Sequence, residues 1–61
     1  MKEIYSYIKT IHNLNKKTYA INYLAYLQGH GTEPDRGSLS YMAAQAVRYE
    51  INTLFNQNKQ K

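Results

Sequence analysis

Hydrophobic side chains recur along the chain at the spacing of an α-helix, in two blocks. The first block covers residues 2–28 and the second covers residues 38–56. No run of β-branched residues alternates with polar ones for long enough to predict a strand. The pattern therefore predicts an all-α fold: a small helical bundle or helical hairpin of two or three helices, forming a single domain over residues 1–61.

The segment between the two blocks, residues 29–37, is expected to be a loop. It holds all three glycines and the only proline of the chain. Proline has no backbone N–H to donate, and a glycine in a helix interior costs about 1 kcal/mol relative to alanine. Gly29 is the expected stop of the preceding helix, because glycine readily adopts the left-handed conformation in which many helices end.

The first block, residues 2–28, has two interpretations. Its apolar residues up to Leu14 share one helix face, whereas those after Thr18 fall on a different arc. A break within residues 13–17, with Thr18 as the N-cap of a second helix, explains this change and is the interpretation that we favour. The alternative is one long helix with a heptad-like stripe through the break, made of Ile4, Tyr7, Ile11, Leu14, Thr18, Ile21 and Ala25.

The second block predicts a helix over residues 38–57. Ser38 or Ser40 can cap it, because a serine hydroxyl accepts a hydrogen bond from an unpaired N–H group of the first turn. Residues 58–61 have nothing left to bury, so we expect them to fray. The predicted apolar face comprises Ala43, Ala44, Val47, Ile51, Leu54 and Phe55.

The length of the chain limits how such a fold is stabilised. A domain of 61 residues buries only about 60% of the surface that its unfolded form exposes. The chain contains no cysteine, so disulfides, thiolate zinc sites and thiol nucleophiles are excluded. Well-packed helices or association remain, and we expect a homodimer that completes the core by pairing apolar faces.

No arrangement of side chains predicts catalysis, so we expect a protein that is not an enzyme and uses no cofactor. The one dense polar cluster consists of His30, Glu33 and Asp35, within the expected loop. Its spacing matches no established metal site, so the sequence predicts an ordinary loop and no bound metal. The phosphate-binding loop, the dinucleotide fingerprint and the nucleophile elbow are also absent from the sequence.

The tyrosines support the leading hypothesis about function. Seven tyrosines are many for so small a core, because each buried hydroxyl needs a hydrogen-bond partner. Tyr19, Tyr23 and Tyr26 share one face of the first block, and tyrosine is enriched at protein interfaces. We therefore expect a regulatory or inhibitory adaptor that docks on another protein through these three rings. The alternative is that the rings simply complete the core.

A second hypothesis is a small DNA-binding regulator. The net charge is +4, and the outer face of the last helix carries Gln45, Arg48 and Asn52, whose side chains suit base edges. Lys16 and Lys17 could add phosphate contacts. Against this hypothesis, residues 29–37 exceed the turn of about three or four residues in a helix-turn-helix motif.

Sequence features also bear on the setting of the protein. No stretch reaches the roughly 18 consecutive apolar residues of a membrane span, and the first residues lack the apolar segment of a signal peptide. We therefore expect a cytoplasmic protein without membrane contact. Frequent asparagine and tyrosine are typical of AT-rich coding, which on composition alone indicates a phage or another mobile element.

Overall fold

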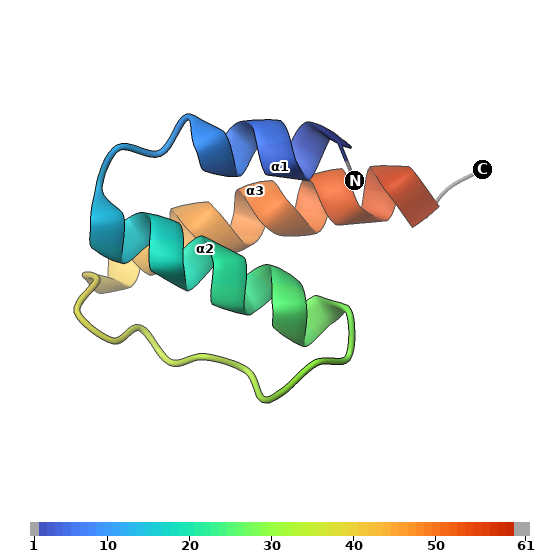
Figure 1. Ribbon diagram of the computed structural model, residues 1–61. Helices are drawn as coiled ribbons and strands as arrows, with labels where there is room; N and C mark the ends of the chain where they lie inside the picture. Colours follow the sequence, from blue (N-terminus) through green and yellow to red (C-terminus); the bar gives the residue numbers. More distant parts are fainter. Residues whose placement is uncertain (1, 60–61) are drawn as a thin grey trace.

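The computed structural model describes residues 2–59 and forms a three-helix bundle (Figure 1). Helix α1 spans Lys2–Lys9, α2 spans Leu14–Leu27 and α3 spans Tyr41–Lys59. No strand occurs within these residues. The prediction of a small all-α fold is confirmed, and the three-helix form of it is the one observed.

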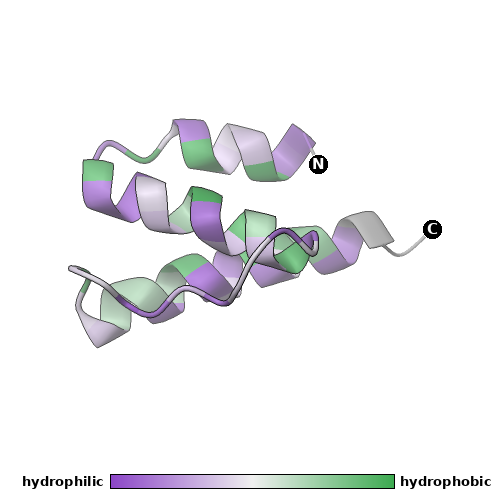
Figure 2. Ribbon diagram, turned by 60° about the horizontal axis from the view of Figure 1, so that its bottom comes forward, coloured by the Kyte–Doolittle hydropathy of each residue, from purple (hydrophilic) through white to green (hydrophobic). Residues whose placement is uncertain are grey.

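The helices are arranged with α2 and α3 side by side and running in the same direction, whereas α1 runs in the opposite direction (Figure 1). Neighbouring helices that run the same way need a connection as long as the first of them. Helix α2 has 14 residues, which is about 21 Å at about 1.5 Å per residue. Residues 28–40, called the connection below, cover this distance as a largely hydrophilic strap along the seam between α2 and α3 (Figure 2).

The core lies between the three helices and is closed by one chain. Ile4 from α1 and Ala44, Val47 and Ile51 from α3 have no exposed surface. The predicted apolar face of the last helix is confirmed, since Leu54 and Phe55 also pack against this core. The remaining buried residues are Ile8, Ile11, Tyr19, Ala20, Tyr23 and Leu24. Pairing with a second copy is therefore not needed to complete the core.

The first block is two helices, as favoured, but the second of them begins earlier than predicted. Asn13 is the N-cap of α2, and its Oδ1 accepts a hydrogen bond from the Lys16 N–H at 2.9 Å. Thr18, the predicted cap, lies exposed within the helix. The single-helix alternative is wrong: Leu14 and Ile21 of its stripe are 75% and 51% exposed. The break at Asn13 turns that stripe away from the core.

The two helix ends that border the connection are capped by residues of the expected types. Gly29 has a φ of 88°, and the N–H groups of Gly29 and His30 donate to the carbonyls of Tyr26 and Ala25, at 3.0 and 2.9 Å. These two bonds form a Schellman motif, so Gly29 ends α2 as predicted. The last helix begins at Tyr41 and not at residue 38 as predicted, because Ser40 rather than Ser38 caps it: the Ser40 Oγ accepts a hydrogen bond from the Ala43 N–H at 3.2 Å.

The predicted end of the last helix is wrong at residues 58 and 59, which are helical rather than frayed. The physical reason is that no glycine or proline follows Gly37 in the sequence, so nothing interrupts the backbone hydrogen bonds there. Residues 60 and 61 of the expected frayed tail lie outside the described residues.

The corrected cap gives a test of the fold. We expect Asn13→Ala to lower the free energy of unfolding by about 1 kcal/mol, because it removes the hydrogen bond to the first turn of α2. Thr18→Ala is the control and should be neutral or slightly stabilising, since alanine is the better helix former. Urea denaturation followed by circular dichroism measures both values. A larger loss in Thr18→Ala than in Asn13→Ala would contradict the cap assignment.

Candidate functional site

At the seam between α2 and α3, a residue of the predicted tyrosine surface contacts two residues predicted to bind DNA. The Tyr23 hydroxyl donates a hydrogen bond to Asn52 Oδ1 at 3.0 Å. The Arg48 guanidinium lies over the Tyr23 ring, 5.1 Å from its centre, and forms an ion pair with Glu33 of the connection. These four residues are called the Tyr23 network below, and they tie α2, α3 and the connection together.

The prediction that Tyr19 and Tyr23 are displayed to a partner is wrong. They are only 5% and 4% exposed, and Tyr26 is half-buried against the same core. The rings of Tyr19 and Tyr23 stack with their centres 6.5 Å apart, and Tyr26 lies 5.9 Å from Tyr23. Burial is tolerated because Asn52 and Arg48 supply polar contacts to Tyr23, so the alternative that the rings complete the core is the one observed.

The surroundings of Arg48 favour its charged form. Burial lowers the pKa of the guanidinium, but the nearby Tyr19 hydroxyl and the Glu33 carboxylate raise this pKa by more, and the net shift is upward. The Tyr19 hydroxyl is buried and, although it is near Arg48, it forms no hydrogen bond with any described residue. An unpaired buried hydroxyl is destabilising, so Tyr19 contributes through its ring.

The residues predicted to contact DNA are divided between the interior and the surface. Arg48 and Asn52 contact Tyr23, and only Gln45 of the three is exposed. Lys16 and Lys17 are half-buried in the first turn of α2. The prediction that all three residues lie on the outer face of the last helix is wrong for Arg48 and Asn52, because α2 and the connection cover the flank of α3 on which they lie.

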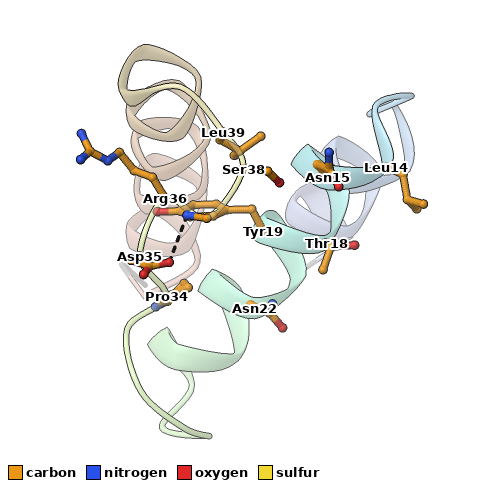
Figure 3. A pocket seen from close by; sticks show the side chains of 11 residues that line it. Leu14, Asn15, Thr18, Tyr19, Asn22, Pro34, Asp35, Arg36, Ser38 and Leu39 are labelled. Atoms are coloured by element: carbon orange, nitrogen blue, oxygen red, sulfur yellow. Dashed lines mark hydrogen bonds between the residues drawn. The ribbon is translucent and has the colours of Figure 1, made fainter.

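A groove lies between α2 and the second half of the connection (Figure 3). It has a volume of about 300 Å³. One wall and the floor come from α2, and the opposite wall comes from the connection, so the groove runs along the helix. Its lining consists of Leu14, Asn15, Thr18, Tyr19 and Asn22 from α2 and residues 34–39 from the connection.

The wall formed by the connection is shaped by local hydrogen bonds. Asp35 Oδ1 accepts a hydrogen bond from the Gly37 N–H at 3.0 Å, and Gly37 has a φ of 59°, which favours glycine. The Arg36 side chain points away from the groove, and its guanidinium lies 5.1 Å from the centre of the Tyr41 ring (Figure 3). The guanidinium is therefore turned out of the groove, although Arg36 contributes to the lining together with Asp35.

The α2 wall carries polar side chains with free hydrogen-bonding capacity. Asn15, Thr18 and Asn22 lie on successive turns of one helix face. Within residues 2–59, neither these side chains nor the Ser38 hydroxyl makes a hydrogen bond. The sequence signal for this wall was the polar spacing of residues 15, 18 and 22. This signal was missed because the polar wall becomes a groove only where the connection runs opposite it. The path of the connection leaves no periodic pattern in the sequence.

Metal binding finds no support in the expected loop. Among the residues that the structure describes, no three histidine, aspartate or glutamate side chains lie close enough together to hold an ion. Glu33 pairs with Arg48 and Asp35 with the Gly37 N–H, so both acids have structural partners. None of the helices within residues 2–59 is long and apolar enough to cross a membrane.

The chain matches no protein-family model, no curated protein and no solved structure. What the protein does is therefore inferred from the geometry of its own residues.

The Tyr23 network gives a test of the seam. We expect Tyr23→Phe to lower the free energy of unfolding by about 1 kcal/mol, because Asn52 loses its hydrogen-bond donor. Tyr49, which is 73% exposed, supplies the control, and Tyr49→Phe should change stability by less than about 0.5 kcal/mol. Urea denaturation measures both variants, and equal losses in the two would refute the role of the Tyr23 hydroxyl.

Proposed function

We propose that this chain is a non-enzymatic binding module that holds a short extended segment of another protein in the groove beside α2. The observation that carries the proposal is the row of unpaired polar side chains, Asn15, Thr18 and Asn22, which faces the connection across about 300 Å³ of open space. This site replaces the tyrosine face as the docking surface, since those rings lie in the core.

The chemistry of the α2 wall matches a peptide main chain. An asparagine side chain carries both a donor and an acceptor, so it pairs with the N–H and C=O of one extended residue. Asn15 and Asn22 are seven positions apart on α2, which is about 10 Å along the helix axis. An extended chain covers this distance in about three residues, at about 3.3 Å each. The two amides are therefore spaced to hold successive parts of one short segment.

The rest of the lining favours an uncharged or apolar segment. Leu14, Pro34 and Leu39 offer apolar surface within the same groove. Nucleic acid is disfavoured there, because its phosphates would meet the Asp35 carboxylate, while the Arg36 guanidinium is stacked on Tyr41. The volume lies at the lower end of the range for ligand sites, about 300–1,000 Å³, which suits a few residues.

A module of this kind acts by occupying a segment of its partner, so we propose a regulatory or inhibitory adaptor. The cytoplasm as its compartment and a mobile element as its origin are parts of the same proposal, and they rest on composition. DNA binding is the weaker alternative, because Arg48 and Asn52 already have partners within the chain.

The test is selection of short random peptides on the immobilised protein, followed by affinity measurements by fluorescence anisotropy. We expect the double variant Asn15→Ala/Asn22→Ala to bind the selected peptides at least about tenfold more weakly, since two amide contacts are lost. Asn56→Ala, at an exposed position of α3, is the matched control and should bind like the unmodified protein. Circular dichroism verifies that both variants fold.

Two results would count against the proposal. One is the absence of any enriched peptide, and the other is equal affinity in the double variant and in the unmodified protein. Because the lining of the groove holds one acidic and one basic residue, the affinity for an uncharged peptide should change little between about 50 and 200 mM salt. Binding of a labelled DNA duplex that persists at the higher salt, with a steep salt dependence, would instead favour the DNA-binding alternative.

A further inference from the structure

The outward face of α3 carries an apolar row that neither α1, α2 nor the connection covers. Met42, Ala46, Tyr49 and Thr53 lie on the side of the helix opposite the buried core residues, and we call them the α3 stripe. Met42 is 80% exposed, Tyr49 is nearly as exposed, and Ala46 and Thr53 are exposed as well. Their spacing of four, three and four positions is that of a seam between two packed helices.

The charges around the stripe restrict the partner. Arg48, Glu50 and Lys59 are the only charged residues of α3 in the sequence. Arg48 is paired with Glu33 at the seam with α2, so Glu50 is the one charge next to the stripe among the α3 side chains that the structure describes, while Arg36 of the connection lies over the neighbouring Tyr41 ring. An anionic lipid surface or a nucleic acid would need several cations on this face. An acidic or basic protein surface would lose the hydration of its charged groups without gaining an ion pair. The face therefore fits a partner that is also helical and uncharged.

The α3 stripe itself meets this description. We infer that the protein forms a two-fold dimer in which the α3 stripes of two copies pack against each other in antiparallel orientation. The net charge of +4 makes two copies repel over most of their surface, but two uncharged stripes bring no like charges together.

The side-chain volumes favour the antiparallel orientation. In that register Ala46 faces Tyr49 of the second copy, and Met42 faces Thr53 of the second copy, so each large side chain meets a small one. Glu50 then lies near Gln45 of the second copy and not near the other Glu50. Parallel pairing would place Tyr49 against Tyr49 and Ala46 against Ala46, which leaves one layer crowded and the next one empty. The antiparallel contact is isologous and closes at two copies.

Sedimentation equilibrium over about 10 µM to 1 mM protein tests the dimer, a range suited to a contact made by one helix from each copy. We expect the average mass to rise with concentration and Ala46→Lys to weaken the association at least about tenfold. Ser6→Lys, on the exposed side of α1, adds the same charge away from the stripe and is the control. It should associate like the unmodified protein.

A mixing experiment tests the register. In the antiparallel dimer, Ala46→Lys should associate with Tyr49→Glu more tightly than with Ala46→Glu, whereas parallel pairing predicts the reverse order. The dimer proposal is overturned if the unmodified protein stays monomeric up to about 1 mM, or if Ser6→Lys and Ala46→Lys weaken association equally. Neither result affects peptide binding, since the groove and the α3 stripe share no residue.

Discussion

Tyr23 is the side chain through which three separate parts of the chain hold one another in place. Its ring packs between α2 and α3, its hydroxyl donates to Asn52, and its face receives the Arg48 guanidinium. Because Arg48 also pairs with Glu33, the first half of the connection is fixed to the same point. Pro34 and the following residues build the wall of the groove, so the shape of the groove depends on a contact that lies outside it.

The hydrophobic period predicted α3 and its buried face because one apolar stripe dominates that helix. On α2 there are two apolar stripes, one with Leu14 and Ile21 and the other with Tyr19 and Tyr23. Periodicity cannot choose between them. The choice is made by α3, whose Asn52 and Arg48 offer partners only to the tyrosine side.

The position of the N-cap of α2 also depends on tertiary packing. Asn13 and Thr18 are both good N-cap residues, and the burial of Ile11 decides at which of them the chain turns. The groove was not predictable, because it depends on the path of the connection.

Neither proposed surface contains a lysine, the residue type that supplies most of the positive charge of the protein. The lysines of the first two helices give the chain most of its excess of positive charge, which favours solubility and keeps copies apart. The α2 wall of the groove instead offers amides and a hydroxyl, and the α3 stripe offers a methionine, an alanine and a tyrosine. Recognition by such surfaces depends on shape and hydrogen bonding, and it is therefore less sensitive to salt than recognition by ion pairs.

The parallel course of α2 and α3 has a consequence for how long the protein survives. The connection is the only covalent link between these helices, and its backbone is largely exposed over residues 28–40, as in segments that proteases cut. A segment held in the groove would cover part of this strap and stabilise the folded chain by an amount that grows with the logarithm of the free segment concentration once this exceeds Kd. Proteases would then degrade copies without a bound partner faster than copies with one. The cellular amount of the module would therefore follow the amount of its target.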